Sequence, residues 1–499
     1  MLIAIAPAIS AQTLGAVDTD YTGSSSEGPA SDRDSVYSYM AELNGSVAGG
    51  DHTPFWLVNG RYGLSSLKKN NGYLRAGAFR HADKQSRWDW DFGVDLVGAA
   101  HYTSEFVVQQ LYAGVRYRCL DLYIGSKENP TMFLDPQLSS GDMVQSINAR
   151  PVPQVRLGVE RYTYIPFTKH KLAFRAYFAM GMFTDQDWQY TFTKGEHTRN
   201  KRVLYHSKGL FLRWGDTQKF PLTVEGGLEM AAQWGGEIIY SNGKIVKPGH
   251  SFKNFLKAIF PASSSSTDES LAGDVINIEG NHVGQWNLAV AWTPKDQDWG
   301  ARLYYQHFFD DHSMMFFDYL WRDMLLGVEL QLPKNPFVKK FVYEYLITKD
   351  QSGPVIWDKT PEIPEQISSG DNYYNNFLYN AWQHWGMAIG NPLLTSPIYN
   401  TDGVITFYNN RVKANHFGFT GEPLCDLDYR VLFSYNRSWG TYNFPTPNVT
   451  HQYSGLIELN YHPERLKGWG ARLSVAADWG NLTGHSSGAM LSIIKKGWL

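Results

Sequence analysis

The stretch 87–119 most constrains the fold, because polar and apolar residues alternate there at every second position in two consecutive runs. The first run has an apolar and an acidic side, formed by Trp90, Phe92, Val94 and Leu96 and by Asp89, Asp91 and Asp95. Since a β-strand sends successive side chains to opposite faces, each run predicts a strand with one apolar face. Each run also reaches the roughly 9–11 residues that a tilted strand needs to cross a bilayer. The pair predicts a transmembrane hairpin.

The same alternation recurs along the rest of the chain. Further candidate strands include 35–44, 73–81, 172–180, 222–230, 324–330, 341–347, 411–421, 427–435, 471–479 and 488–496. With the intervening shorter segments the count is about eighteen strands, and single-chain outer-membrane barrels have an even number. We therefore predict an all-β fold, a closed transmembrane antiparallel β-barrel of about eighteen strands.

The connections between these strands support the barrel. The long gaps at 45–70, 128–153, 184–201, 234–282 and 350–410 each follow an odd-numbered strand. Gaps after even-numbered strands are short, and several contain proline. Outer-membrane barrels have short periplasmic turns and longer extracellular loops. The pattern predicts a periplasmic N-terminus and extracellular placement of every long gap.

Composition excludes other classes of protein. The chain has 499 residues and no internal apolar run near the roughly 18 residues of a spanning helix. The aromatic content of 15% suits the aromatic girdles of a barrel. A net charge of −3 gives no reason to expect a nucleic-acid partner.

The N-terminal residues predict export. Residues 1–11 are apolar and small and resemble the end of a secretory signal, residues 12–34 form a polar flexible segment, and 35–499 form the barrel. Cys119 and Cys425 fall at predicted tight turns far apart in strand order, so we expect free thiols.

Charged residues at the inward positions of the strands are the first candidate site. They are Asp89, Asp91, Asp95, Arg116, Arg156, Arg175, Glu225, Glu229, Glu329, Arg430 and Arg472. One interpretation is that they pair across neighbouring strands and fill the barrel with a polar network. The alternative is that some line a pore and select ions or sugars.

Catalytic and metal-binding motifs are not apparent. The histidines show no H-E-x-x-H spacing, and the chain contains no G-x-S-x-G motif or glycine-rich phosphate loop. Asp310, Asp311 and His312 could bind a divalent cation, although a solvated turn is the simpler interpretation. We expect no metal, no cofactor and no catalysis.

Aromatic and amide residues in 371–398 are the second candidate site. The candidates for contact with polysaccharide are Tyr373, Tyr374, Asn376, Trp382 and Trp385. Flat aromatic rings beside amides suit the apolar faces and polar rims of sugars. The alternative is that these rings form the hydrophobic core of a large loop over the barrel mouth.

Several stretches resemble the Wzi-type capsule assembly family of outer-membrane proteins. They are Thr53-Pro54-Phe55-Trp56-Leu57 with Arg61-Tyr62-Gly63-Leu64, Gly226-Gly227-Leu228-Glu229, Trp321-Arg322-Asp323 with Gly327-Val328-Glu329, and Gly390-Asn391-Pro392-Leu393-Leu394. The resemblance implies a barrel of about eighteen strands, occluded by helices and loops, that acts as a lectin for capsular polysaccharide and not as an enzyme. It transfers no sugar-binding position, because external loops vary most.

Two functions remain open at this point. The first is a non-catalytic protein of the Gram-negative outer membrane that binds capsular or other extracellular polysaccharide during capsule assembly. The alternative is a general or sugar-selective diffusion porin, which the charged lumen alone favours. In either case we expect a monomeric barrel with outer-membrane lipid as its other partner, and an enzyme has no visible nucleophile.

Overall fold

The computed structural model describes residues 36–83, 86–217, 219–249, 280–294, 299–310, 322–351 and 371–499. Eighteen strands form one sheet in which every neighbouring pair is antiparallel. The sheet closes where β1 (Tyr37–Gly50) pairs with β23 (Ser486–Trp498) over 13 residue pairs, from Ser38↔Trp498 to Gly50↔Ser486. The protein is therefore a closed antiparallel β-barrel, as the alternation predicts.

Each wall strand pairs with the next one along the chain, apart from short strands in the connections. Between β1 and β23 the wall comprises β2 (Asn70–Arg80), β3 (Trp88–Ala100), β4 (Phe106–Tyr117), β5 (Leu120–Ser126), β6 (Gln154–Tyr164), β7 (Leu172–Met182), β9 (Leu204–Trp214), β10 (Leu222–Trp234), β13 (Asn281–Trp292), β14 (Gly300–Asp310), β15 (Met324–Gln331), β16 (Lys340–Ile347), β19 (Val412–Leu424), β20 (Leu427–Gly440), β21 (Pro445–Tyr461) and β22 (Trp469–Gly480).

The hairpin β3–β4 shows how the alternating sequence forms this wall. Trp90, Leu111 and Val115 are 46%, 52% and 44% exposed on the outside, whereas Asp95 on the opposite face has no exposed area. The register shifts between Asp95 and Leu96, where β4 carries the extra residue Gln109 beside Gln110. Both glutamines are buried, so this bulge turns two successive side chains inward.

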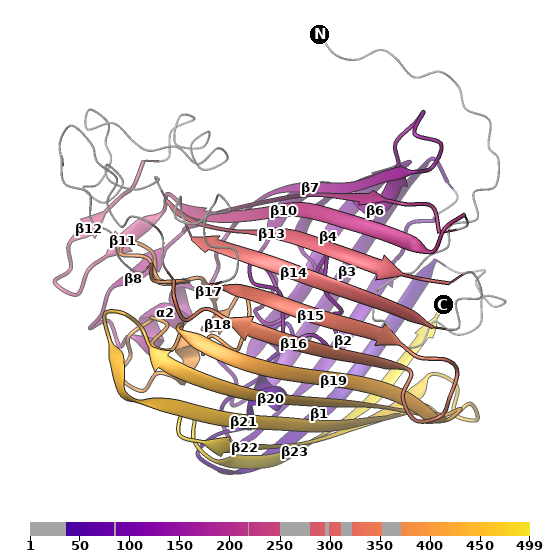
Figure 1. Cartoon of the computed structure of the whole chain (residues 1–499). Helices are drawn as coiled ribbons and strands as arrows, with labels where there is room; N and C mark the ends of the chain where they lie inside the picture. The colour runs from indigo at the N-terminus through magenta and orange to yellow at the C-terminus, as the bar shows by residue number, and fades with distance from the viewer. Residues whose placement is uncertain are drawn as a thin grey trace.

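The two ends of the barrel differ in the length of their connections. At the inner end, eight turns of two to eight residues join the strands, and the C-terminus lies there (Figure 1). The long connections and their short elements gather at the opposite, outer end (Figure 1). This is the predicted asymmetry, and it assigns the long connections to the cell exterior.

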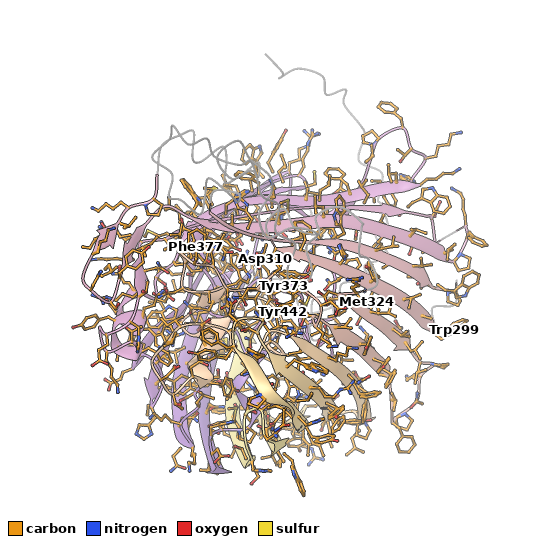
Figure 2. All side chains as sticks on the ribbon, turned by 60° about the vertical axis from the view of Figure 1, so that its left-hand side comes forward. Trp299, Asp310, Met324, Tyr373, Phe377 and Tyr442 are labelled. Carbon is orange, nitrogen blue, oxygen red and sulfur yellow. The ribbon has the colours of Figure 1, made fainter. Side chains whose placement is uncertain are left out.

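The outer surface of the wall is an apolar band bounded by aromatic rings. Six indoles on the outer surface mark the inner end of the barrel: Trp88, Trp214, Trp292, Trp299, Trp469 and Trp498. Figure 2 shows Trp299 at this end and Phe377 and Tyr442 toward the other. Indole rings prefer the membrane–water interface, so the six residues place the inner boundary of the bilayer. Among the described helices, none has the length and apolarity to cross a membrane.

Three of the outer connections enter the lumen, and we call them together the plug: residues 51–69, 127–153 and 371–410. Most of their residues are buried. They carry the short helix α1 (Phe55–Val58), the hairpin of β17 (Gln383–His384) and β18 (Met387–Ala388), and the 3-10 helix η2 (Pro397–Tyr399). Loops and short helical segments thus occlude the lumen, as predicted.

A close contact between wall and plug occurs at Gly418 of β19. A Cβ atom there would lie 2.3 Å from the carbonyl oxygen of Leu138 in the plug. Only glycine lets the plug backbone approach the wall this closely.

A second group of short elements lies above the wall at the outer end. It consists of α2 (Gln186–Phe192) and a three-stranded sheet of β8 (Arg199–Lys201), β11 (Glu237–Ile239) and β12 (Ile245–Val246). The sequence pattern predicts polar loops at these positions, because two- or three-residue strands are too short to show alternation.

Some features expected from the sequence lie outside the described residues. At the start of α1 the Thr53 hydroxyl donates to the Lys68 carbonyl oxygen over 2.8 Å, and Pro54 occupies the N-cap position. Cys119 and Cys425 are free and exposed in inner turns, as expected. The predicted signal remnant 1–11 and flexible segment 12–34 lie outside the described residues, as do Asp311 and His312.

Candidate functional site

The charged positions inside the wall are joined to partners on neighbouring strands and on the plug. At the inner end, Asp89 accepts from Arg80 over 2.9 Å, and Arg116 pairs with Asp121 over 2.7 Å. Deeper in the barrel, Arg156 pairs with Glu160 over 2.9 Å and lies on the Tyr177 ring. Arg175 lies on Tyr162, with 4.5 Å between the guanidinium carbon and the ring centre.

The first contact between wall and plug is made by Arg75 of β2, which is held by Asp95 of β3. The Asp95 carboxylate accepts two hydrogen bonds from the guanidinium of Arg75, at 2.9 Å and 2.5 Å. Arg75 also pairs with Glu128, the second residue of the plug segment 127–153, over 3.0 Å. Lys127 pairs with Asp91 over 2.9 Å. These ion pairs fix the start of the segment to β2 and β3.

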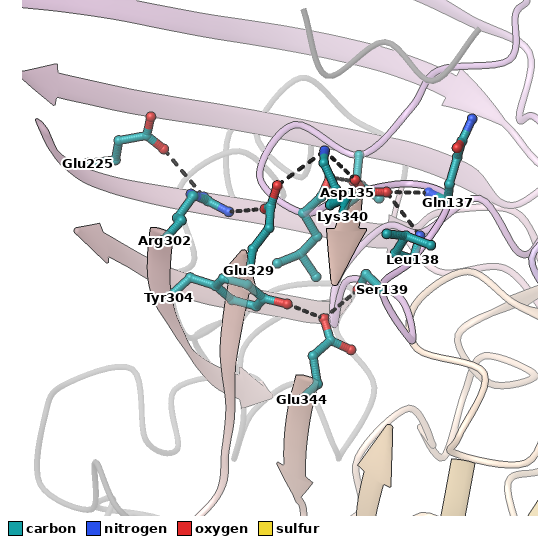
Figure 3. Close-up of polar contacts among 12 residues, drawn as sticks. Asp135, Gln137, Leu138, Ser139, Glu225, Arg302, Tyr304, Glu329, Lys340 and Glu344 are labelled. Carbon is teal, nitrogen blue, oxygen red and sulfur yellow. Dashed lines mark hydrogen bonds and ion pairs between the residues drawn. The ribbon is translucent and has the colours of Figure 1, made fainter. Parts of the chain in front are cut away.

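On the opposite side of the barrel, a chain of ion pairs runs along the inner face of the wall from β10 to β16 and reaches the plug (Figure 3). Glu225 of β10 accepts from Arg213 over 2.6 Å and from Arg302 of β14 over 3.4 Å. Arg302 also approaches Glu329 of β15 at 3.8 Å. Glu329 pairs with Lys340 over 3.2 Å, and Lys340 pairs with Asp135 of the plug over 2.9 Å. Alternating signs along this chain neutralise charges that burial would otherwise make unfavourable.

Glu344 of β16 holds the middle of the same plug segment. Its carboxylate accepts hydrogen bonds from the Ser139 hydroxyl at 2.6 Å, the Ser140 N–H at 2.7 Å and the Tyr304 hydroxyl at 2.6 Å. Figure 3 shows Tyr304 and Ser139 on two sides of this carboxylate. A buried carboxylate with three donors is a strong anchor, because each hydrogen bond involves a charged acceptor.

The plug also contacts the far side of the wall. Arg430 of β20 donates to the Gln137 carbonyl oxygen over 3.1 Å and pairs with Glu458 over 2.9 Å. Glu458 receives a second cation, Arg61 of the plug segment 51–69, at 3.1 Å. Arg472 donates to Asn460 over 2.9 Å. Plug residues therefore bond to strands on opposite sides of the lumen.

Glu229 of β10 lies in a hydrogen-bonded group deep in the lumen. It accepts from the Tyr177 hydroxyl at 2.5 Å and from Gln285 at 3.2 Å. In the plug, Asp142 accepts from Gln306 at 3.0 Å, and its burial raises the pKa of its carboxyl to about 6.

Three of the five aromatic-loop candidates are buried in the plug. Tyr373, Tyr374 and Trp382 have no exposed area. Tyr374 donates to the Met143 carbonyl oxygen, and the Trp382 indole N–H donates to the Val144 carbonyl oxygen over 2.9 Å. A buried ring offers no face to a sugar, so the expected role is corrected to packing for these three residues. The alternative interpretation, in which these rings form the hydrophobic core of a large loop, fits all three residues.

Asn376 and Trp385 occupy more open positions. The side-chain oxygen of Asn376 accepts from the backbone N–H groups of Leu378 and Tyr379 at 2.9 and 3.3 Å, so it shapes a turn. Trp385 is half-buried with a positive φ of 56°. Its indole N–H approaches the Thr184 hydroxyl at 3.4 Å. Among the five candidates, Trp385 is the ring that keeps part of its surface open.

Arg150 lies against Trp385 and was not identified from the sequence. Its guanidinium carbon is 4.3 Å from the centre of the indole, and one nitrogen donates to the Thr103 hydroxyl at 2.6 Å. Within the described residues it has no carboxylate partner, and its buried Nε has no acceptor. Burial lowers the pKa of Arg150 to about 10, so it stays charged at neutral pH.

Tyr102 belongs to the same group, because its buried hydroxyl also has no hydrogen-bond partner among the residues that the structure describes, and it interacts electrostatically with Arg150. Thr103, Arg150 and Trp385 come from three different outer connections. No spacing in the sequence signals such a cluster, since only the fold brings these connections together.

A small cavity lies between the plug and β20. Its volume is about 20 Å³, and its lining includes Trp56, Asn59, Gln137, Asn148 and Arg430. A cavity of this size holds about one water molecule. In the part of the chain that the structure describes, no three His, Cys, Asp or Glu side chains gather as metal ligands.

Solved outer-membrane barrels share this fold. Wzi, described as a carbohydrate-binding β-barrel involved in group 1 capsule assembly in Escherichia coli, has a TM-score of 0.55 and 11% identity, with coverage of 93% of this chain and 85% of Wzi. OccAB2 of Acinetobacter baumannii has a TM-score of 0.47 and 10% identity over 92% of this chain and 98% of its own. OprD of Pseudomonas aeruginosa has a TM-score of 0.46 and 11% identity over 93% and 95%.

These identities establish the fold alone. No protein-family model matches the sequence, and no curated protein matches it either. The closed wall, its apolar outer band and the fold shared with Wzi identify the chain as a Gram-negative outer-membrane β-barrel.

Proposed function

We propose that this barrel is a non-catalytic outer-membrane protein that binds capsular or other extracellular polysaccharide at the cell surface and takes part in capsule assembly. The observation that carries the proposal is the plug. Its ion pairs and hydrogen bonds reach β3, β16 and β20, on different sides of the lumen. A segment fixed in this way suits a surface-binding barrel better than an open diffusion channel.

Two further observations support this function. A solved structure that shares the fold, with a TM-score of 0.55, is described as a capsule-assembly protein that binds carbohydrate. The charges inside the barrel are also engaged in a polar network, as in the chain from Glu225 to Asp135. Paired charges of this kind serve to hold the plug rather than to select permeating ions.

Trp385 and Arg150 are the proposed contact point for the glycan. The half-open indole provides an apolar surface for a sugar ring. Arg150 beneath it carries a positive charge without a carboxylate partner in the described residues. A charged guanidinium that has no carboxylate partner within the described part of the protein suits an acidic sugar, because carboxylates form charge-assisted hydrogen bonds with arginine.

Conductance in planar bilayers separates the proposal from the porin alternative. The wild-type barrel is expected to show no steady current of porin size. A variant in which residues 135–148 are replaced by a short glycine-serine linker is expected to conduct, because this change removes the contacts to Glu344 and Lys340. A steady open current from the wild type would contradict the proposal and favour a porin.

Binding of purified capsular glycan tests the surface role directly. Trp385→Ala is expected to weaken binding by roughly fivefold, in line with the energy of an aromatic contact. Trp479→Ala is the matched control, since this indole is 73% exposed on the outside of the wall. Deletion of the gene is expected to release capsule from the cells. Retained capsule together with no glycan binding by the purified barrel would refute the function.

A further inference from the structure

A row of basic side chains crosses the outer surface of the wall near its outer end. Lys413 of β19 lies opposite Arg437 of β20, and Arg437 lies opposite His451 of β21. These residues share the outward face of the wall, because on β20 Phe433 is 40% exposed and the neighbouring Ser434 is 1% exposed. The row is therefore on the lipid side of the barrel and not in its lumen.

A row of aromatic rings lies directly below the basic row. Tyr435 and Tyr453 are opposite each other, and their ring centres are 4.6 Å apart. The Tyr435 hydroxyl and the His451 ring nitrogen are within hydrogen-bond distance at 2.8 Å. Tyrosine rings collect at the membrane–water interface, so the basic row above them lies at the level of the lipid headgroups.

Two more cations extend this row beyond the ends of the strands. Trp439 lies between Lys349 and Arg437, whose charged groups are 5.2 and 5.7 Å from its ring. Arg411 lies on the Tyr442 ring at 3.8 Å and donates to the Lys349 carbonyl oxygen over 2.9 Å. We call Lys349, Arg411, Lys413, Arg437 and Trp439 the outer basic patch.

Within the described part of the chain, no ion pair with a carboxylate compensates the charge of the outer basic patch. Like charges directly opposite each other on neighbouring strands destabilise a sheet, and Lys413 and Arg437 form such a pair. Among the described residues, none of the four cations takes part in an ion pair with a carboxylate. Asp350 follows Lys349 in the chain, and its carbonyl oxygen accepts from the Tyr442 hydroxyl over 2.7 Å. An external anion would relieve the repulsion.

We propose that the outer basic patch binds the phosphorylated headgroup of a glycolipid in the outer leaflet of the outer membrane. The position selects this ligand, because the side chains face the lipid beside the wall rather than the barrel mouth. Clusters of Lys and Arg at a membrane surface attract anionic headgroups, and each cation contributes to the affinity. Phosphate oxygens accept hydrogen bonds from both lysine and arginine. The inference is independent of the proposed polysaccharide function.

Native mass spectrometry of the purified full-length barrel in detergent, with lipid A as the probe, tests this proposal. Bisphosphorylated lipid A is expected to bind, and the dephosphorylated form is expected to bind at least roughly tenfold more weakly. The double variant Lys413→Gln/Arg437→Gln is expected to lose ten- to thirtyfold in affinity for the bisphosphorylated form, at roughly tenfold per 1.4 kcal/mol. Both residues are half-buried on the outer surface, and heat-modifiable gel mobility checks that the variant folds.

The matched control removes the same charge at the inner end. Lys219→Gln/Lys339→Gln changes two cations in inner turns, whose side chains are 72% and 60% exposed. This control is expected to bind lipid A as the wild type does. Equal losses in both double variants, or equal binding of the dephosphorylated lipid, would overturn the proposal. Competition by inorganic phosphate at millimolar concentration would also overturn it, because the patch would then take free phosphate rather than a lipid.

A third arm separates lipid from polysaccharide. Capsular glycan is expected to bind the Lys413→Gln/Arg437→Gln variant as it binds the wild type. Loss of glycan binding with lipid A binding retained would overturn the lipid assignment. Failure of the polysaccharide function, by contrast, would appear in the Trp385→Ala comparison and leave the lipid A result unchanged.

Discussion

Buried charges inside the barrel depend on single, well-defined partners. Asp95 has no exposed area and accepts from Arg75, whose side chain is 13% exposed, and from Gln110 at 3.1 Å. Removal of one member of a buried ion pair leaves the other charge without compensation. Substitutions at this pair should therefore lower the stability of the wall far more than substitutions at ion pairs near the inner rim.

The first prediction concerns this pair. Asp95→Ala is expected to lower the free energy of unfolding by about 3–5 kcal/mol, because Arg75 would lose its fully buried carboxylate partner and retain the more exposed Glu128 alone. Urea unfolding in lipid vesicles, followed by tryptophan fluorescence, measures the change. Asp121→Ala at the more open Arg116–Asp121 pair serves as the control, with an expected loss below about 1 kcal/mol. Equal losses would contradict the prediction.

The second prediction concerns pH. Asp323 precedes β15, and burial raises the pKa of its carboxyl to about 6, although it accepts from the N–H groups of Asp350 and Gln351 and from the Tyr373 hydroxyl. The unfolded chain has a pKa near 3.9, so the folded state binds more protons between about pH 4 and 6. Stability contributed by this group is therefore lost as pH rises through that window.

Lowering the pH from 7 to 5 is thus expected to stabilise the wild type by about 1 kcal/mol more than Asp323→Asn, which cannot titrate. Chemical unfolding of both proteins at the two pH values measures the difference, and other titrating groups cancel in the comparison. An identical pH response in the two proteins would show that the pKa of Asp323 is not raised.

At the scale of an element, the plug segment 127–153 shows how loop sequence becomes interior structure. The segment has no regular strand or helix, yet nearly all of its residues are buried or half-buried. Its backbone polar groups find partners on the wall, such as the Leu138 carbonyl oxygen with the His416 ring at 2.9 Å. Irregular backbone at membrane depth is tolerated where it is enclosed by protein in this way.

The third prediction concerns the anchor of this segment. Glu344→Ala removes the acceptor for Ser139, Ser140 and Tyr304, so the segment should open locally while the wall persists. Protease cleavage within 135–148 is expected to become at least roughly tenfold faster. Glu422→Ala, at an ion pair whose side chains are 60% and 58% exposed, is the control and should leave cleavage unchanged. Unchanged cleavage in Glu344→Ala would show that other contacts hold the plug.

The aromatic segment 371–398 illustrates an ambiguity of loop sequences. Its rings suit both a sugar platform and a hydrophobic core, because each uses flat apolar surface beside amides. The burial of each ring distinguishes the two roles. The Tyr373 ring packs edge-on against Phe308 of β14, with 4.7 Å between the ring centres, whereas Trp385 stays partly exposed. Contacts between distant segments decide this, and no local pattern encodes them.

At the scale of the whole molecule, the outside of the barrel is apolar and the inside is charged, the reverse of a soluble protein. Indoles on the outer surface include Trp88, Trp90, Trp214, Trp292, Trp299, Trp469, Trp479 and Trp498. Others are buried within the protein, among them Trp56, Trp188, Trp234 and Trp382.

The fourth prediction follows from this distribution. Lipids with brominated acyl chains are expected to quench most of the tryptophan emission of the reconstituted barrel and to leave a residual signal from the buried indoles. In Trp56→Phe and Trp382→Phe the quenched fraction should rise, and in Trp88→Phe and Trp469→Phe it should fall. Emission that is insensitive to brominated lipid would refute the membrane placement of the wall.

The sequence by itself determined the wall of this protein. A period of two residues assigns each side chain to one of two faces, so the position of Asp95 or Glu329 on the charged face follows from local order alone. Lengths of gaps then distinguish the two ends of the barrel. Only the tertiary structure decided the plug, the burial of Tyr373, Tyr374 and Trp382, and the meeting of Arg150 with Trp385. These contacts join residues far apart in the chain, where no period relates one position to another.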